Sequence, residues 1–267
     1  MIVLGFDTST PSTAVAVRLS DGATTQARDD PPAGAHPGHA TRLLEMAADV
    51  LARAGVGWSA IDRIAVGVGP GTFTGLRVGV ATARGLAQSL SVELVGVSSP
   101  RALAAAALAT AAAWEGVEEG DRETLEAADG KALGQGVLAV IDARRGEAFA
   151  AAYELGEQGA PRELASPRAL APQALATVIA EAEAEAGGAR RSWLAVGDGA
   201  VRFREQLESA GIRTPPDSSS LHLVSGAAVC ELGARAAAAS LHEIVPDYRR
   251  RPDAELALAG AGRAQAS

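Results

Sequence analysis

Two aspartates lie where predicted strands end, a position from which carboxylates can hold magnesium beside a phosphate. Asp7 ends the apolar segment 2–7, and Asp142 ends the apolar segment 137–142. Each is followed by a turn and a second apolar segment, and a third carboxylate, Asp198, lies in a loop between Gly197 and Gly199. Aspartate is also a common turn residue. The pattern leaves two interpretations open: a phosphate and magnesium site between two lobes, or ordinary turns.

A glycine-rich loop offers a second candidate anion site. The β-branched run 64–68 predicts a strand, Gly69-Pro70-Gly71 predicts a tight turn, and a helix over 75–90 follows. Free backbone N–H groups at the start of a helix attract anions, which makes this loop a candidate phosphate site. The Gly-Lys-Ser/Thr ending of a P-loop is missing, because leucine and arginine follow Gly75. A Walker-type NTPase is therefore not predicted.

The helix predicted over 75–90 lacks bulky side chains along one side. Gly75, Gly79, Ala83 and Ala87 recur every four residues and therefore form one ridge. Each interior glycine costs roughly 1 kcal/mol relative to alanine, so close packing is the expected reason for them. The ridge is predicted to pack either on the chain's own sheet or on a partner.

The helix predicted over 39–54 has a broad apolar surface, wide enough for two neighbours. Its two adjacent stripes are Leu43, Ala47, Val50 and Ala54, and Leu44, Ala48 and Leu51.

Other reactive residues have little support as a site. His36 and His39 have a His-x-x-His spacing, but no nearby cysteine or third histidine completes a zinc site. Cys230 lies in an apolar helical pattern and is predicted to be a core residue. No Gly-x-Ser-x-Gly elbow occurs, so nucleophilic catalysis is not predicted.

Composition and charge narrow the class of protein. The chain has 267 residues, of which 48% are hydrophobic, enough for one large domain or two lobes. It has no long uninterrupted apolar run and no basic leader, so we expect a cytoplasmic protein with no membrane association. The net charge of -8 argues against direct binding of nucleic acid.

Alternating helices and strands predict an α/β fold with a partly parallel sheet. Six helices are expected, at 39–54, 75–90, 101–113, 172–186, 201–210 and 224–241. The strand, aspartate, turn and strand around Asp7 are repeated around Asp142, which suggests two related lobes. The segment 115–131 has seven acidic and two basic residues and is predicted to be a solvated insertion. The predicted units are an N-terminal lobe at 1–113, a linker at 114–136, a C-terminal lobe at 137–255 and a flexible tail at 256–267.

Several motifs, in the same order along nearly the whole chain, resemble those of the bacterial TsaB (YeaZ) family. They are Phe6-Asp-Thr-Ser-Thr10, Gly69-Pro-Gly-Thr-Phe-Thr-Gly-Leu-Arg-Val-Gly79, Ala83-Arg-Gly-Leu-Ala87, Gly96-Val-Ser-Ser99, Ile141-Asp-Ala-Arg144, Gly197-Asp-Gly199, Pro246-x-Tyr248 and Arg250-x-Pro-Asp-Ala254. The second of these is the most specific.

This resemblance implies an actin-like, Hsp70-like (ASKHA) fold with two duplicated lobes, each with a mixed sheet covered by helices. It also implies a role in forming N6-threonylcarbamoyladenosine in tRNAs that read codons beginning with A. In that system a larger paralogue, TsaD, performs the transfer, TsaB is its non-catalytic partner, and the ATPase TsaE joins the assembly. The resemblance therefore implies that tRNA is met only through the complex, that ATP and magnesium act at the level of the complex, and that this chain binds no cofactor tightly.

The resemblance implies that the TsaD paralogue has a motif of the form Gly-Val-Asn-His-x-x-x-His, whose histidines hold its metal. This chain has Gly96-Val-Ser-Ser99 at that place and no histidine, so the paralogue's metal ligands are missing here. Asp198 stands in the loop that corresponds to the paralogue's adenosine-side glycines, and its charge would repel a phosphate. These departures predict a vestigial nucleotide site, made of Asp7, Thr8, Gly69, Gly71, Asp142, Gly197 and Gly199.

In the family the first two helices of the N-terminal lobe form the dimer face. The predicted interface residues are Leu43, Leu44, Ala47, Leu51, Gly75, Gly79, Ala83 and Ala87, in a heterodimer with the TsaD-like paralogue or in a homodimer without it. Gly79→Leu is expected to block this contact and leave the fold intact. The alternative function is an ATPase or kinase-like enzyme of the same fold that uses Asp7 and Asp142 around magnesium. A peptidase, the older label of relatives, has almost no support because neither metal ligands nor a nucleophile can be assigned.

Overall fold

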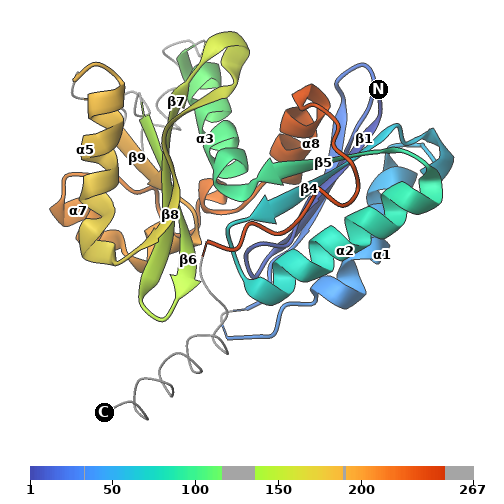
Figure 1. Cartoon of the computed structure of the whole chain (residues 1–267), viewed down its shortest axis with the longest axis horizontal. Coiled ribbons are helices and arrows are strands. Elements are labelled where there is room, and N and C mark those ends of the chain that lie inside the picture. The colour runs from blue at the N-terminus through green and yellow to red at the C-terminus, as the bar shows by residue number, and fades with distance from the viewer. Residues whose placement is uncertain (33, 116–135, 189–190, 250–267) are drawn as a thin grey trace.

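Two sheets form the framework of the protein in a computed structural model that describes residues 1–32, 34–115, 136–188 and 191–249 (Figure 1). The first sheet has the order β3-β2-β1-β4-β5 and the second has the order β8-β7-β6-β9. The strands of the first are β1 (Val3–Asp7), β2 (Thr13–Arg18), β3 (Thr24–Asp29), β4 (Arg63–Gly69) and β5 (Glu93–Ser98). Those of the second are β6 (Gly136–Arg144), β7 (Glu147–Leu155), β8 (Pro161–Leu170) and β9 (Trp193–Val196).

The same connection pattern occurs in both sheets. Strand β1 pairs antiparallel with β2 and parallel with β4, and β6 likewise pairs antiparallel with β7 and parallel with β9. Strand β1 ends at Asp7, as predicted, whereas β6 continues two residues past Asp142 to Arg144, across an irregularity in its pairing with β7. This duplication confirms the predicted α/β fold of two related lobes.

Helices cover both sheets and also fill the space between them (Figure 1). The outer face of the first sheet carries α1 (His39–Arg53) and α2 (Phe73–Leu90), and the outer face of the second carries α5 (Leu175–Glu185) and α7 (Arg204–Ser209). Between the sheets lie α3 (Ser99–Glu115) and α8 (Gly226–Arg235). The short α6 (Asp198–Arg202) follows β9.

The two inner helices cross between the halves of the chain. Helix α3 follows the first sheet in sequence but packs on β6 and β7, and α8 follows the second sheet but packs on β1 and β2. Together with the inner faces of both sheets they form one apolar core. Of the predicted units, the segments 116–135 and 250–267 lie outside the described residues.

Helix α8 ends at Arg235, so the predicted helix over 224–241 is too long. Arg63 explains the end, because its guanidinium donates to the carbonyls of Gly233 and Ala236, both at 2.8 Å. These bonds satisfy acceptors that the last helical turn leaves open. The chain then becomes extended, and Ala239 pairs with Leu94 of β5. The predicted helix over 201–210 is also interrupted, at Phe203 between α6 and α7.

Cys230 is a core residue, as predicted. It is fully buried in α8, and its thiol lies 3.3 Å from the carbonyl oxygen of Ala16. Burial raises the pKa of the Cys230 thiol to about 12. A Cβ atom at Gly5 would lie 2.6 Å from the Cys230 sulfur, so this glycine is needed for the close approach of α8 to β1. No helix in the described ranges combines the length and apolar character that crossing a bilayer requires.

Candidate functional site

Asp7 is buried, and groups of its own chain use both of its carboxylate oxygens. Oδ1 accepts hydrogen bonds from the backbone N–H and the hydroxyl of Ser9, at 2.7 and 2.6 Å, and Oδ2 accepts one from the Ser99 hydroxyl at 2.6 Å. A Cβ atom at Gly67 would lie 1.8 Å from Oδ2, so the carboxylate is wedged against β4. A magnesium ion would have to displace these donors.

The glycine loop before α2 packs tightly against the turn that follows β1. The N–H of Thr72 donates to the Ser9 carbonyl at 2.7 Å, and a Cβ atom at Gly71 would lie 2.3 Å from that same oxygen. Gly69 has a φ of +98°, a conformation that favours glycine. The hydroxyl of the fully buried Thr8 donates to the Gly75 carbonyl at 2.7 Å. These glycines therefore serve contacts within the chain.

Asp142 is neutralised by arginines. Its Oδ1 accepts the backbone N–H of Arg144 at 2.8 Å, and its Oδ2 accepts from the guanidinium groups of Arg202 at 2.8 Å and Arg144 at 3.2 Å. Only 7% of Asp142 is exposed. Two ion pairs thus occupy the oxygen that would otherwise face a cation.

The loop between β9 and α6 packs on β6. Gly197 has a φ of +109°, and a Cβ atom there would lie 2.1 Å from the Val140 carbonyl oxygen. A Cβ atom at Gly199 would lie 2.8 Å from the carbonyl carbon of Ile141. Asp198 accepts the backbone N–H of Asp142 at 3.0 Å. The structure thus brings Gly197 and Gly199 together with Asp142, and Gly69 and Gly71 together with Asp7 and Thr8. Within the described ranges, no hydrogen bond or ion pair joins one group to the other.

Burial raises the pKa of Asp198 from 3.8 to about 6, and the nearby Asp142 carboxylate adds to the rise. Because this folded-state pKa is above the unfolded one, the folded chain binds more protons between about pH 4 and pH 6, and stability falls as pH rises through that window. We expect Asp198→Asn, which keeps an acceptor for the Asp142 N–H, to raise the free energy of unfolding at pH 7.5 by about 2 kcal/mol.

Urea unfolding at pH 7.5 and pH 4 measures this effect. Near pH 4 the carboxyl is largely protonated in the folded state, so the variant and the parent should be almost equally stable. A variant less stable than the parent at pH 7.5 would contradict the raised pKa.

The two histidines of the His-x-x-His spacing lie in different environments. His36 is exposed, whereas His39 is 4% exposed and its Nδ1 lies 2.8 Å from the Thr13 hydroxyl. Burial lowers the pKa of His39. Within the described ranges, no group of three or more His, Cys, Asp or Glu side chains is placed to hold a metal ion.

The small-residue ridge of α2 faces the chain's own sheet. Gly75, Gly79, Ala83 and Ala87 are all buried, and a Cβ atom at Gly79 would lie 2.4 Å from the Thr8 hydroxyl. The predicted placement of this ridge on a partner surface is therefore wrong. Its lack of bulk lets the α2 backbone approach β1 and β4 closely.

Most of the predicted interface residues of α1 are buried as well. Leu43, Ala47 and Leu51 are at most 2% exposed and pack in the core beneath α1 and α2. These three are thus corrected to core positions. Leu44, half of whose surface is exposed, is the one predicted interface residue that reaches the outside.

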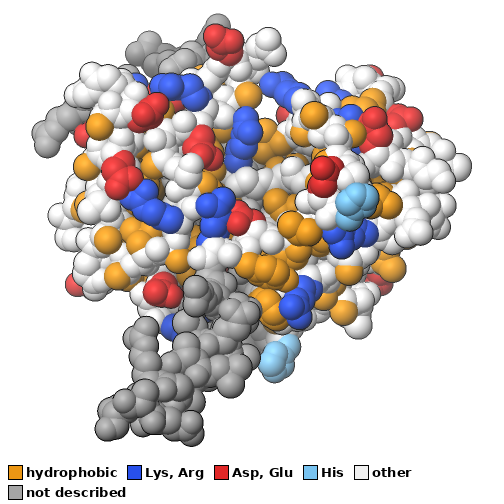
Figure 2. Space-filling model, viewed as in Figure 1, with side chains coloured by type: hydrophobic (Ala, Val, Ile, Leu, Met, Phe, Trp, Pro, Cys, Tyr) orange, Lys and Arg blue, Asp and Glu red, His pale blue; other side chains and the backbone are white. Residues whose placement is uncertain are grey.

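An exposed aromatic cluster lies at the start of α2, formed by Phe73, Arg77 and Tyr248. The rings of Phe73 and Tyr248 lie 5.2 Å apart, and the Arg77 guanidinium lies 3.8 Å from the centre of the Phe73 ring. Arg77 also donates to the Tyr248 hydroxyl at 3.0 Å. Phe73 is 39% exposed and Tyr248 is 43% exposed. In Figure 2, hydrophobic and basic side chains lie side by side over this part of the molecule.

The C-terminal segment holds Tyr248 in place. Ile244 is buried in the core beneath α2, and the N–H of Asp247 donates to the Val68 carbonyl at 2.7 Å. Phe73, Arg77 and Tyr248 all lie in motifs that resemble those of the TsaB family, but they are not among the predicted interface residues. Their signal was the rarity of aromatic residues, which make up 3% of the chain.

Comparison with known proteins identifies the family. The TsaB protein of Escherichia coli, named as a tRNA threonylcarbamoyladenosine biosynthesis protein, is 30% identical over 212 residues, which are 79% of this chain and 78% of the relative. The chain belongs to the TsaB family. The TsaB protein of Haemophilus influenzae is 37% identical over 107 residues, which are 40% of this chain and 43% of that protein.

Solved structures agree with this assignment to the TsaB family. YeaZ from Pseudomonas aeruginosa has a TM-score of 0.66 and 29% sequence identity, over 92% of this chain and 99% of that one. The family model described as TsaD, tRNA N6-adenosine threonylcarbamoyltransferase, matches residues 30–116, a segment that contains α1 and α2.

Proposed function

We propose that this chain is a non-catalytic subunit that binds a TsaD-type transferase and supports it in forming N6-threonylcarbamoyladenosine in tRNA. The observation that carries the proposal is that hydrogen bonds and ion pairs within the chain already use the carboxylate oxygens of Asp7 and Asp142. Asp7 is bonded by Ser9 and Ser99, and Asp142 is paired with Arg144 and Arg202. Membership of the TsaB family supports the tRNA pathway, and the match of the TsaD model supports common ancestry with the transferase.

In this proposal the transferase binds the outer face of α2, and the exposed side chains of that face support the choice. Exposed aromatic and arginine side chains are the residues that most often anchor protein interfaces. Among the ion pairs of the described residues, none includes Arg77 or Arg84, although the whole chain has a net charge of -8. This face therefore suits a partner surface that supplies carboxylates.

The complex also contains a TsaE-type ATPase in this proposal, and ATP and magnesium act there. The tRNA is held by the assembled complex, consistent with the acidic character of this chain. A homodimer through the same face forms when the transferase is absent, and light scattering with and without the transferase tests it.

Reconstitution tests the supporting role. The TsaD-type transferase, the ATPase, ATP and unmodified tRNA are incubated with and without this chain, and modified adenosine is measured by mass spectrometry of digested tRNA. We expect modification to fall strongly when the chain is omitted. Equal modification in both reactions would overturn the proposal.

Calorimetry with Mg-ATP separates the proposed subunit from an enzyme of the same fold. We expect the isolated chain to show no heat of binding, because the phosphate-side carboxylates and glycines already contact each other. Tight binding, or release of phosphate by the isolated chain, would favour an ATPase or kinase instead.

A further inference from the structure

Two adjoining cavities lie between α3, α8 and the turn that follows β7. Their volumes are about 680 and about 370 Å³, and both are lined by Ala160, Leu232 and Arg235. Small-molecule sites commonly have volumes of roughly 300–1,000 Å³. Because they share these residues, we treat the cavities as one site, the α3–α8 groove. The larger cavity lies toward the start of β1, because Thr24 lines it and aligns through β2 with Val3. The smaller cavity reaches Ser98 at the end of β5, next to the Ser99 that bonds Asp7.

The larger cavity has mainly apolar walls. Small side chains on both helices leave the space open, and the turn after β7 closes one side. The apolar lining includes Ala105, Ala106, Ala109, Ala227, Ala228, Leu155 and Pro161. Removing an apolar ligand from water into such a space is favourable.

The smaller cavity ends in basic and hydroxyl groups. Arg101 lines it and donates to the Pro161 carbonyl at 3.2 Å, and no ion pair of the described residues includes Arg101. Ser98 also lines it, and its buried hydroxyl lies beside that of Tyr153, with no other hydrogen-bond partner among the described residues. A hydroxyl can rotate to donate to an anion.

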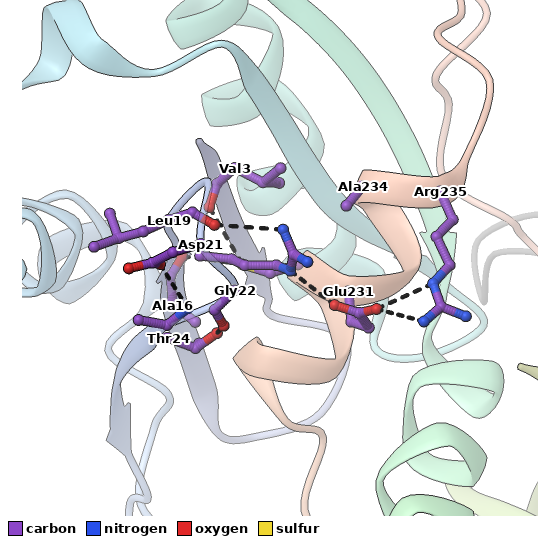
Figure 3. A network of polar contacts seen from close by, with 12 residues as sticks. Val3, Ala16, Leu19, Asp21, Gly22, Thr24, Glu231, Ala234 and Arg235 are labelled. Carbon is purple, nitrogen blue, oxygen red and sulfur yellow. Dashed lines mark hydrogen bonds and ion pairs between the residues drawn. The ribbon is translucent and has the colours of Figure 1, made fainter. Parts of the chain in front are cut away.

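The one carboxylate of the groove is already neutralised. Figure 3 shows Glu231 and Arg235 on α8, joined by two contacts of 2.7 and 3.0 Å, and Arg18 approaches the other oxygen of Glu231 at 2.8 Å. Arg235 also donates to the Gln158 carbonyl at 3.0 Å. Because no ion pair of the described residues includes Arg101, the charge at the polar end of the groove is positive.

We propose that the α3–α8 groove binds a small amphiphilic carboxylate. The apolar body lies along the alanines of α3 and α8, and the carboxylate is bound by Arg101, with the Ser98 hydroxyl beside it. The alanine-lined part of this site lies between the two sheets, on the other face of the first sheet from α2.

Calorimetry on the full chain tests the site with three ten-carbon probes, decanoate, decanol and decylamine, below the concentrations at which they aggregate. We expect one decanoate to bind per chain, decanol to bind about tenfold more weakly and decylamine to bind weakest, because a charge-assisted hydrogen bond adds to the same apolar contact. Arg101→Met keeps an apolar stem and should lower decanoate affinity to that of decanol without changing decanol affinity.

A matched pair of substitutions on α3 locates the ligand. Ala109 is exposed and lines the groove, whereas its neighbour Thr110 is exposed and does not line it. Ala109→Phe should abolish decanoate binding, and Thr110→Phe should leave it unchanged, with equal melting temperatures showing that both variants fold. Three results would overturn the proposal: no decanoate binding, preference for decylamine, or equal losses in the two phenylalanine variants. If Ala109→Phe does not fold, an equal loss of decanoate and decanol affinity in Arg101→Met would still overturn it.

Discussion

Gly75→Ala is expected to destabilise the protein by about 3 kcal/mol or more, the upper range for overpacking a filled core. A Cβ atom at this position would lie 1.9 Å from the Thr8 carbonyl oxygen and 2.6 Å from the Thr72 hydroxyl. The first of these is a backbone atom of a fully buried residue, so it cannot move aside as a side-chain end can. Moving α2 away from β1 to make room for the Cβ atom would also strain the hydrogen bond from the Thr8 hydroxyl to the Gly75 carbonyl. Urea unfolding of the variant measures the loss.

Gly85 provides the control on the same helix. A Cβ atom there meets nothing within 4 Å, and the residue is exposed. Gly85→Ala should therefore stabilise the protein by up to about 1 kcal/mol, because alanine favours the helix more than glycine does. If the two variants have the same stability, the ridge of α2 does not pack on β1 as described.

The packing of α2 on Thr8 also corrects the expectation that Gly79→Leu would block a partner and leave the fold intact. A Cβ atom at Gly79 would already lie 2.4 Å from the Thr8 hydroxyl, so a leucine there would disturb the core. Loss of binding in such a variant would report damage to the fold, so the exposed residues of α2 are the correct positions for a test.

Local patterns in the sequence predicted the strands and their duplication well. The apolar segments that contain Asp7 and Asp142 became the central strands of the two sheets, because a continuous apolar run and the turn residues that follow it are short-range signals. The same patterns could not decide which side of α2 faces inward. A ridge of small residues suits any close neighbour, and that choice depends on Thr8, which is far away in sequence.

Long-range polar contacts account for what sequence reasoning missed. The donor that closes off Asp7 is Ser99, 92 residues away, and the group that ends α8 is Arg63, 170 residues from Gly233. Neither pair has a spacing rule. Sequence could therefore name the carboxylates of the candidate site but not predict that the chain itself satisfies them.

Phe73→Ala and Arg77→Glu are each expected to weaken binding of the TsaD-type transferase about 100-fold, because losing an aromatic or arginine anchor typically costs about 2–4 kcal/mol. Both side chains belong to the exposed aromatic cluster, so the melting temperature should change little. Calorimetric titration of the purified partners measures the affinity. Arg168→Glu is the charge-reversal control, because Arg168 lies on β8 of the second sheet, away from α2. Arg168 is paired with Glu181 at 2.6 Å, so the melting temperature of this variant is compared with that of the parent.

Raising the salt concentration separates the electrostatic contribution of Arg77 to binding from the apolar contribution of Phe73. If Arg77 meets carboxylates of the transferase, parent affinity should fall as salt rises, and the deficit of Arg77→Glu should shrink because screening weakens both the attraction and the new repulsion. The deficit of Phe73→Ala should stay constant, since apolar burial is not screened. Unchanged affinity in both variants, together with intact tRNA modification, would show that the transferase binds elsewhere on this chain. A loss in Arg168→Glu equal to that in Arg77→Glu would show that general charge, and not the α2 face, governs the association.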